Sequence, residues 1–248
     1  MKKVMLITGG SRGIGAATAQ LAANKGYAVC LNYLKNKLAA HTIVNEINLN
    51  GGQAIAVSAD IGVEHEVTEL FNAIDTQLGP ITALVNNAGI LETQMRVDMM
   101  DAARLNRVFA VNIIGSFLCA KEAIKRMSNK QGGSGGAIVN VSSAASRLGS
   151  AGEYVDYAAS KGAIDTFTIG LSREVAVDGI RVNAVRPGFI YTDIHAAGGD
   201  PNRVDRLKEG IPLQRGGHPD EVANAILWLL SEEASYTTGT FIDVAGGR

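Results

Sequence analysis

The chain has 248 residues, 46% of them hydrophobic and 19% charged, and its 29 glycines far outnumber its 5 prolines. This composition is typical of a buried sheet joined by tight turns, and the length suits a single domain over residues 1–248. The net charge of -1 comes without a long run of one sign, which excludes a nucleic-acid-binding surface and a polybasic membrane patch and leaves a small-molecule partner.

Short runs rich in Val, Ile and Leu alternate along the chain with longer stretches of helical period, which is typical of βαβ units. The first run lies in MKKVMLITGG, whose apolar part is too short for a signal peptide, so we expect a strand there. The expected strands are 4–8, 28–32, 54–58, 83–86, 137–141, 181–185 and 240–244. Because continuous apolar strands are covered on both faces, we expect an α/β fold: a doubly wound, seven-stranded parallel sheet with helices on both sides.

The helical stretches have identifiable starts and apolar faces. Apolar residues recur at helical spacing from Val67 to Leu78, and a later helix is expected from His218, where Pro219 and two acidic residues follow. Two longer helices, near 106–127 and 155–175, have apolar positions beyond one stripe, so a second face needs covering. The glycine-rich segment QGGSGG is expected to be a flexible connection.

No stretch approaches the ~18 continuous apolar residues of a membrane span, so we expect no membrane contact. The two cysteines, Cys30 in an expected strand and Cys119 in an expected helix, lie in apolar surroundings. They cannot form a disulfide framework or a metal site by themselves, and the chain shows no cluster of metal-ligand residues. We therefore expect no metal and a cytoplasmic location.

A glycine-rich turn follows the first expected strand, with the sequence TGGSRGIG and a helical pattern after it. Glycines let the backbone turn sharply and approach a pyrophosphate, whose charge is stabilised by the free N–H groups at the start of the helix. The spacing GxxxGxG differs from the more familiar GxGxxG, and a glycine-rich turn alone can be purely structural. Its position between a strand and a helix favours a phosphate-binding site.

Four motifs follow one another in the order TGGSRGIG, Asn86-Asn87-Ala88-Gly89, YAASK from Tyr157 to Lys161, and Pro187-Gly188. Together they resemble the short-chain dehydrogenase/reductase family, over the entire chain. Within that family, the sequence most resembles that of an uncharacterised bacterial oxidoreductase. Its resemblance to glucose dehydrogenases and 3-oxoacyl reductases is more distant. The resemblance implies a Rossmann fold, hydride transfer between an NAD(P) nicotinamide and a carbonyl or secondary alcohol, and a homotetramer.

The resemblance also assigns residues to the cofactor. Asp60 is expected at the adenine amino group, the Asn86 motif on the adenosine side, and the segment after Pro187 at the carboxamide and phosphates. The alternative for Asp60 is a cap of the following helix, and both roles are compatible. The implied cofactor-binding residues are Gly9, Ser11, Arg12, Gly13, Ile14, Gly15, Asn32, Tyr33, Asp60, Ile61, Asn86, Ala88, Gly89, Tyr157, Lys161, Pro187, Gly188, Ile190 and Thr192.

Tyr157 and Lys161 lie four residues apart, hence on one face of a helix. The same YxxxK pattern occurs at Tyr33 and Lys37, but that copy follows the second strand, at the adenosine end. A phenol pKa must fall from about 10 to about 7 for easy proton exchange, a shift worth ~4 kcal/mol, and one cation at ~4 Å supplies about that much. The resemblance therefore makes Tyr157 the general acid/base, with Lys161 lowering its pKa and binding the nicotinamide ribose.

Ser143 and Asn112 complete the implied catalytic set. Ser143 would polarise the substrate carbonyl, and Asn112 would hold a water that passes protons from Lys161. Ser142 is adjacent, but successive strand side chains point to opposite faces, so only one serine faces the cleft, and the family motif favours Ser143. The alternatives are a backbone-bonded strand-end serine at Ser142 and a satisfied buried polar residue at Asn112.

The residues after the second strand favour NADP over NAD. NAD-preferring relatives place an acidic residue there, whereas this chain has Asn32-Tyr33-Leu34-Lys35. Arg12 inside the glycine turn could bind the 2'-phosphate as a charge-assisted fork, and Lys35 could add a second charge. The alternative is that both cations are solvated, with NAD also accepted.

The substrate is not identified by these patterns. The segment 191–210 resembles a mobile lid, and the residues expected to line a polar pocket are Arg147, Glu153, Tyr154 and His195. Such a pocket suits a hydroxylated or anionic substrate, although each residue could equally be solvated. Two rival functions remain. One is a catalytically idle NADP-binding sensor or scaffold, which an intact catalytic set disfavours. The other is a serine hydrolase, for which this chain has no well-placed histidine.

Overall fold

Seven strands form one parallel sheet in the order β3-β2-β1-β4-β5-β6-β7. The computed structural model describes residues 3–248. The strands are β1 Lys3–Ile7, β2 Tyr27–Tyr33, β3 Gln53–Ser58, β4 Ala83–Asn86, β5 Gly136–Val141, β6 Ile180–Pro187 and β7 Phe241–Val244. The order reverses between β1 and β4, so the chain winds outward in two directions from that point, and the predicted doubly wound parallel sheet is confirmed.

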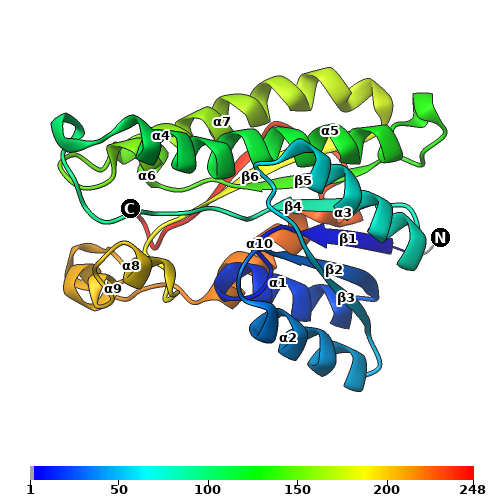
Figure 1. The fold of residues 1–248 in the computed structure, drawn as a ribbon, viewed down its shortest axis with the longest axis horizontal. Coiled ribbons are helices and arrows are strands. Elements are labelled where there is room, and N and C mark those ends of the chain that lie inside the picture. Colours follow the sequence, from blue (N-terminus) through cyan, green and yellow to red (C-terminus); the bar gives the residue numbers. More distant parts are fainter. Residues whose placement is uncertain (1–2) are drawn as a thin grey trace.

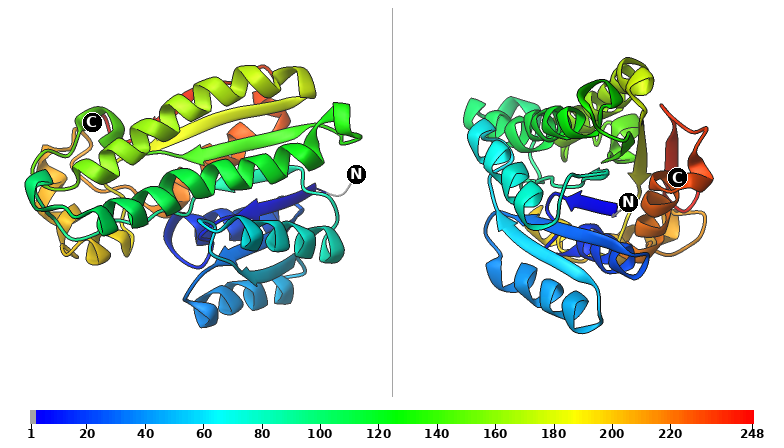
Figure 2. Two further views of the ribbon diagram at one scale, coloured as in Figure 1. Left: turned by 45° about the horizontal axis from the view of Figure 1, so that its top comes forward. Right: turned by 90° about the vertical axis from the view of Figure 1, so that its right-hand side faces the viewer.

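Helices cover both faces of the sheet (Figures 1 and 2). One layer consists of α1 Gly13–Asn24, α2 Lys37–Leu49 and α10 Pro219–Leu230. The other consists of α3 Glu64–Gln77, α4 Ala102–Phe109, α5 Gly115–Met127 and α7 Val155–Val175. The shorter helices are α6 Ala145–Leu148, α8 Ile194–Ala197 and α9 Arg203–Leu207, with 3-10 turns at Val97–Met99, Asn129–Gln131, Ala176–Asp178, Lys208–Gly210 and Glu232–Ala234.

The strand side chains divide between two apolar cores because successive residues point to opposite faces. On β1, Met5 and Ile7 pack in the core that contains α1 and α10, whereas Val4 and Leu6 pack in the core that contains Phe71 of α3. All four of these strand residues are at most 1% exposed. Burial on both faces explains why the strands are continuously apolar in sequence.

One expected helix is interrupted. Residues 106–127 do not form a single α-helix; α4 and α5 are joined by a π-helical turn, Ala110–Ile114, and α4 begins earlier, after Asp101 caps its first turn. A π turn changes the hydrogen bonding to i→i+5 without ending the helix, so the helical stretch of the sequence continues across it. Its buried polar residue is Asn112.

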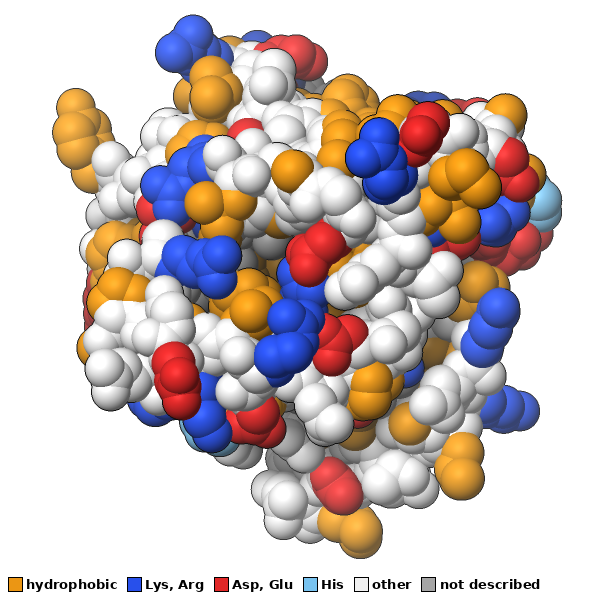
Figure 3. Space-filling view, turned by 90° about the vertical axis from the view of Figure 1, so that its left-hand side faces the viewer, with side chains coloured by type: hydrophobic (Ala, Val, Ile, Leu, Met, Phe, Trp, Pro, Cys, Tyr) orange, Lys and Arg blue, Asp and Glu red, His pale blue; other side chains and the backbone are white. Residues whose placement is uncertain are grey.

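The carboxyl ends of the strands lie at one edge of the sheet, beside α8 and α9 (Figure 1). Seen from that side, charged side chains of both signs surround a hollow in which apolar side chains are visible (Figure 3). In open parallel sheets this edge, at the strand-order reversal, is where ligands bind. Within the described residues, no helix combines the length and the apolar character that crossing a membrane requires.

Candidate active site

The glycine turn after β1 forms a tight cradle at the start of α1. Gly9 has a φ of 62°, and a Cβ there would lie 2.9 Å from Ala88 Cα. A Cβ on Gly15 would lie 2.6 Å from Asn87 Nδ2. Across residues 3–248, no side chain caps α1, whose N-cap is Arg12. The first N–H groups of the helix are thus available to an anion, and both glycines are required by close packing.

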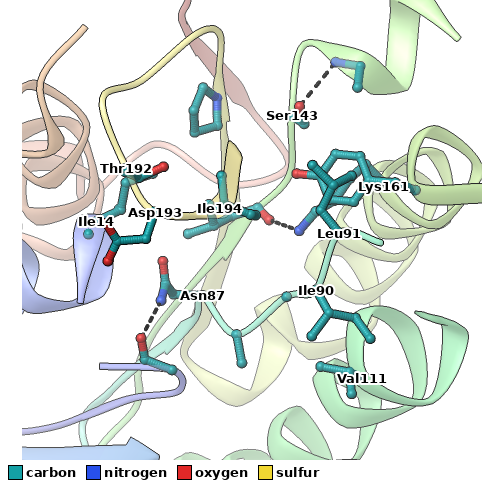
Figure 4. A pocket seen from close by; sticks show the side chains of 18 of the residues that line it. Ile14, Asn87, Ile90, Leu91, Val111, Ser143, Lys161, Thr192, Asp193 and Ile194 are labelled. Atoms are coloured by element: carbon teal, nitrogen blue, oxygen red, sulfur yellow. Dashed lines mark hydrogen bonds between the residues drawn. The ribbon is translucent and has the colours of Figure 1, made fainter. Parts of the chain in front are cut away.

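Polar contacts fix this cradle to the neighbouring strands. Thr8 Oγ1 accepts hydrogen bonds from the main-chain N–H groups of Asn87 and Ala88, each at 3.0 Å. Asn87 Nδ2 donates to the carbonyl oxygens of Thr8 and Gly9 at 2.9 and 3.1 Å. Figure 4 shows Asn87 with one of its hydrogen bonds. Asn32 Oδ1 accepts from Gly9 N at 3.4 Å. The turn is therefore held rigidly between the ends of β2 and β4, as a preformed phosphate site requires.

The adenosine end of the cavity has basic residues at its rim. Arg12 and Lys35 are both exposed and line the cavity, and Tyr33 is buried beside them at the end of β2. Within the described residues, neither cation has a carboxylate partner. This end therefore presents positive charge without an opposing carboxylate from β2.

Asp60 lines the same end but does not cap α3. Its Oδ1 accepts from Gly62 N at 2.9 Å, closing a turn after β3, and the N-cap residue of α3 is Val63. The expected capping role is wrong because the helix starts later than a cap at Asp60 would require. Its placement on the cavity wall is compatible with the expected contact to adenine.

Ser143, Tyr157 and Lys161 are brought together at the carboxyl end of β5. Ser143 hydrogen-bonds to the Tyr157 phenol and accepts from Ala145 N at 3.1 Å. Lys161 Nζ donates to Val141 O at 2.7 Å and lies 5.6 Å from the centroid of the Tyr157 ring. All three catalytic candidates line one cavity, in which Figure 4 shows Ser143 and Lys161.

The protonation states differ from the expected ones. Burial raises the pKa of Tyr157 to about 12, and the Ser143 hydrogen bond opposes this rise. Burial lowers the pKa of Lys161 to about 8, opposed by the negative charge of Asp165. Desolvation dominates the Tyr157 pKa and the Lys161 ammonium bonds Val141 O, so the lowering of the Tyr157 pKa by Lys161 stays a prediction.

The two adjacent serines have separate surroundings, as strand alternation predicts. Ser142 Oγ donates to Asp165 Oδ1 at 2.6 Å and lies 3.2 Å from Lys161 O. Ser143 Oγ, in contrast, faces Tyr157. Ser143 is therefore the serine placed to meet a substrate, and Ser142 is engaged in internal hydrogen bonds.

Asn112 is buried in the π turn, 1% exposed. Its Oδ1 accepts from Ile90 N at 2.8 Å, and its Nδ2 donates to Ile90 O at 3.1 Å and to Ser160 Oγ at 3.0 Å. A Cβ on Gly89 would lie 3.5 Å from both Asn112 Oδ1 and Lys161 Nζ. The absence of a side chain at Gly89 leaves these two polar groups facing the same space.

A buried ion pair secures the start of α7, next to Tyr157. The Nε of Arg104 donates to Asp156 Oδ2 at 2.7 Å, and its Nη1 donates to Thr93 O at 2.7 Å. The two side chains are 4% and 1% exposed. Removing one partner of such a pair leaves a buried charge unpaired, so this contact fixes the helix that carries Tyr157 and Lys161.

The expected lid supplies one wall of the cavity. Glu153 forms an ion pair with Arg203 of α9, and the guanidinium of Arg203 lies 5.0 Å from the Tyr154 ring centroid. Tyr154 donates its hydroxyl to Gly198 O at 3.0 Å. His195 lies near Ile190 O, and burial lowers its pKa. Segment 191–210 is thus packed against the loop before α7, and neither Arg203 nor His195 presents an unbalanced positive charge.

Three sequence-based assignments need correction. Asn86 is buried and donates to Asn140 Oδ1 at 3.0 Å, so its neighbour Asn87 forms the cavity wall. Gly15 packs beneath the turn rather than lining the cavity. Arg147 pairs with Asp243 at 3.1 Å and borders a smaller hollow instead of the main cavity. In each case the side chain, or its absence, serves internal packing.

The expected residues other than these three and Asn112 line a single cavity of about 1240 Å³. It extends from the glycine turn to the lid, a length that combines a dinucleotide site with a second compartment. The expected residues on its wall are Gly9, Ser11, Arg12, Gly13, Ile14, Asn32, Tyr33, Asp60, Ile61, Ala88, Gly89, Ser143, Glu153, Tyr154, Tyr157, Lys161, Pro187, Gly188, Ile190, Thr192 and His195.

Comparison with known proteins identifies the class of this site. Residues 9–248 match a family model described as enoyl-(acyl carrier protein) reductase. The chain is 63% identical to the uncharacterised oxidoreductase YgfF of Escherichia coli, over 99% of both chains. The chain belongs to the short-chain dehydrogenase/reductase family. It is therefore an oxidoreductase of the class that uses a nicotinamide cofactor.

Other short-chain dehydrogenases/reductases match at lower identity. The 3-oxoacyl-[acyl-carrier-protein] reductase FabG of Staphylococcus epidermidis is 36% identical over 100% of this chain and 99% of its own. A crystal structure of 3-ketoacyl-(acyl-carrier-protein) reductase from Brucella melitensis, complexed with NADH, aligns with a TM-score of 0.91 at 31% identity, covering 99% and 98% of the two chains. A dehydrogenase/reductase from Sinorhizobium meliloti aligns at 0.90 and 30%, covering 99% and 94%.

The site of this short-chain dehydrogenase/reductase fits a nicotinamide dinucleotide. Its rigid glycine cradle offers helix N–H groups to a pyrophosphate, and its cavity continues to the catalytic side chains. Sequence reasoning missed some wall residues, above all Arg203, which lies 46 positions beyond Tyr157. No local pattern marks Arg203, because it reaches the cavity only through the folding of the lid.

Proposed function

We propose that this enzyme reduces a carbonyl group to an alcohol with NADPH, using Tyr157 as the proton donor. The observation that carries the proposal is the placement of Ser143, Tyr157 and Lys161 together in one cavity that begins at the glycine cradle. In the direction of reduction, Tyr157, whose pKa is raised to about 12, is protonated at neutral pH and able to donate.

Each side chain has a distinct task in this proposal. The bound dinucleotide supplies the hydride. Ser143 Oγ accepts from Ala145 N, so its hydroxyl hydrogen is left to donate, and it would turn from Tyr157 to the substrate carbonyl oxygen when a substrate is bound. Tyr157 gives its proton to that oxygen, and the Lys161 ammonium stabilises the phenolate left behind. Ser143 and Tyr157 therefore act on the same oxygen atom.

Asn112 is proposed to support the return of the proton to Tyr157. Its Oδ1 and the Lys161 ammonium face the space beside Gly89, where a Cβ would lie 3.5 Å from each of them. A water there would be shared between Asn112 and Lys161. This supports the relay implied by the family resemblance, in which a water held by Asn112 passes protons from Lys161.

The preference for NADP rests on the charge of the adenosine end. Arg12 and Lys35 line the cavity near Tyr33, where NAD-preferring relatives place a carboxylate. A guanidinium can bind the 2'-phosphate of NADP through two parallel hydrogen bonds, whereas the uncharged ribose 2'-hydroxyl of NAD does not require a cation. We therefore propose NADP as the preferred cofactor, with NAD as a weaker alternative.

The substrate compartment favours a polar but uncharged carbonyl compound. Arg203 is already paired with Glu153, and burial lowers the pKa of His195, so neither residue offers a free positive charge to an anion. Ile90, Leu91 and Ile194 add apolar wall near Lys161 (Figure 4). A ketone with a neighbouring hydroxyl or ester group meets both features better than a keto acid.

A homotetramer is proposed from the outer faces of α5 and α7. Phe117 of α5 is 48% exposed, and its ring stacks on that of Phe167 of α7 with centroids 3.8 Å apart. Ile114 of the π turn and Ile169 of α7 are also exposed, at 49% and 39%. Contiguous exposed aromatic and aliphatic side chains are typical of subunit interfaces. A cytoplasmic location stays a prediction from the two buried free cysteines.

The experiment that tests the proposed function is NADPH oxidation with a panel of hydroxyketones, β-keto esters, keto acids and plain aliphatic ketones. We expect turnover with at least one uncharged polar ketone and weaker turnover with the keto acids. Tight NADPH binding without turnover of any compound, including the reverse reaction with the matching alcohols, would favour an idle cofactor-binding protein instead.

A further inference from the structure

A carboxylate lies one helical turn beyond Lys161 on α7, directly behind the catalytic strand end. Asp165 Oδ1 accepts from Ser142 Oγ at 2.6 Å, and the Asp165 side chain is 14% exposed. Ser142 Oγ also lies 3.2 Å from Lys161 O. Because Ser142 precedes Ser143, this contact ties the position of Ser143 to α7.

Arg186 of β6 holds Asp165 from the other side. Its Nε and Nη2 lie 3.1 and 3.0 Å from Asp165 Oδ2, so both oxygens of the carboxylate are engaged. The guanidinium lies 3.9 Å from the Phe241 ring centroid. Its Nη1 lies 3.8 Å from Asp243, its register partner on β7. The orientation of Asp165 is therefore fixed by the sheet rather than by its own helix.

This arrangement is part of a row of alternating charges. Arg147 of α6 pairs with the other oxygen of Asp243 at 3.1 Å, so Arg147, Asp243, Arg186 and Asp165 follow one another from the sheet edge to α7. Asp165 is the member of the row next to the catalytic residues. An ordinary surface ion pair would not extend inward to a serine at the active site.

Lys161 has few charged neighbours. On its own helix the titratable groups facing it are Tyr157 and Asp165, and Arg186 reaches it only through Asp165. From β5, Val141 contributes a carbonyl oxygen. Asp165 is the charged group that acts on the pKa of Lys161, and it raises that pKa against the effect of burial.

We propose that Asp165, oriented by Arg186, is a positioning residue for the reaction: it anchors the Ser142–Ser143 strand end and supplies the negative charge that keeps Lys161 in its ammonium form. The proposal rests on the proposed catalytic roles of Ser143, Tyr157 and Lys161. Arg186 weakens the effect of Asp165 on the protonation of Lys161, because its positive charge partly neutralises Asp165. The two residues therefore act on Lys161 with opposite signs.

The test compares Asp165→Asn and Arg186→Gln with wild type. Asn can still accept the Ser142 hydrogen bond but lacks the charge, whereas Arg186→Gln leaves the Asp165 charge less neutralised. Asp75→Asn is the matched control, since Asp75 also pairs with an arginine, Arg126, but lies on α3. The titration of Lys161 is followed by NMR of ¹³C-labelled lysine in the full-length protein, with Lys161→Met assigning the signal.

We expect the pH midpoint of the Lys161 titration (the Lys161 midpoint) to fall by about one pH unit in Asp165→Asn. It should rise in Arg186→Gln and stay unchanged in Asp75→Asn. The alkaline limb of the pH profile for kcat/KM should shift in the same directions. An unchanged midpoint in a folded Asp165→Asn protein, or shifts of the same sign in both variants, would overturn the proposal. If Asp165→Asn does not fold, a midpoint in Arg186→Gln that fails to rise overturns it.

The NMR measurement requires no turnover. A failure of the proposed function would therefore leave the midpoint shifts in place and remove only the matching shifts in kcat/KM. A failure of the present proposal would do the reverse, with turnover intact and the Lys161 midpoint insensitive to both variants. The conservative Asp165→Glu protein, which retains the charge, should keep the Lys161 midpoint closer to wild type than Asp165→Asn does.

Discussion

Lys161 Nζ donates a hydrogen bond to Val141 O at 2.7 Å, so the helix that carries Tyr157 is tied through a buried ammonium to the strand end that carries Ser143. The bond is largely shielded from bulk solvent, since Lys161 is 4% exposed. Burying a charge destabilises a fold unless an opposite charge or hydrogen bonds compensate it. Lys161, on which the proposed chemistry depends, is such a buried charge.

Lys161→Met is expected to stabilise the fold while abolishing turnover. The fall of the Lys161 pKa from 10.5 to about 8 corresponds to a destabilisation of about 3 kcal/mol, and loss of the Val141 hydrogen bond costs ~1 kcal/mol. Below pH 8 the variant should therefore gain about 2 kcal/mol, and its Tm should rise by roughly 4–8 °C.

The pH dependence of this destabilisation follows from the direction of the Lys161 pKa shift. Because the folded-state pKa is lowered, the native protein binds fewer protons than the unfolded chain between pH 8 and 10.5, and the penalty fades as the pH rises through this window. The control is Lys121→Met, which removes an exposed lysine of α5. A Tm for Lys161→Met below that of wild type at pH 7 would contradict this account of the buried charge.

The pH dependence of carbonyl reduction should report Lys161 rather than Tyr157. Burial sets the pKa of Lys161 to about 8 and that of Tyr157 to about 12. On raising the pH, the ammonium is lost first, while the phenol remains protonated. We expect kcat/KM for reduction to be level below pH 8 and to fall above it. A rate that increases through this range would be incompatible with an ammonium requirement.

Cofactor selectivity should depend on two positions at the adenosine end. Arg12→Ala removes the cation expected to bind a 2'-phosphate, and Tyr33→Asp adds a carboxylate that repels the phosphate and accepts a hydrogen bond from the ribose. Both changes should lower the ratio of kcat/KM for NADPH to that for NADH, Tyr33→Asp more strongly. Wild-type preference for NADH, or an unchanged ratio in both variants, would refute the NADP assignment.

Subunit association should depend on the aromatic stack of α5 and α7. Phe117→Glu places a charge in the exposed apolar patch, so the tetramer should dissociate to smaller species in light scattering at micromolar concentration. Tyr236→Glu is the control, because Tyr236 is fully exposed and lies outside the patch. Wild-type protein that sediments as a stable 26.0 kDa monomer would contradict the proposed assembly.

The fold could be predicted because its causes are local in sequence. Strands buried on both faces must be apolar throughout, and each is followed by a helical pattern, so the parallel sheet follows from the alternation alone. The helix after His218 was predictable for the same reason: Pro219 starts it, and the carboxylate of Glu221 accepts from His218 N at 2.8 Å. The π turn was not, because no residue type or spacing in the sequence marks the change to i→i+5 hydrogen bonding.

The candidate site could be predicted only where a motif specifies it. Tyr157 and Lys161 share a helix, and their spacing puts them on one face. The orientation of Asn86 against Asn87 depends on Asn140, which is 54 positions away, and the ion pair of Arg147 depends on Asp243 on the last strand. Contacts between distant segments leave no spacing pattern, so these side chains were assigned to the cavity in error.

The central claim is that the Tyr157 hydroxyl gives the proton. Its most direct test is kcat of Tyr157→Phe on a verified ketone, with NADPH affinity measured in parallel and Tyr236→Phe as the matched control on an exposed tyrosine. The account predicts a loss of roughly 10²–10⁴-fold in kcat with cofactor affinity retained, and no change in the control. If Tyr157→Phe keeps more than about a tenth of wild-type kcat, a smaller loss than removal of a general acid produces, Tyr157 is not the proton donor.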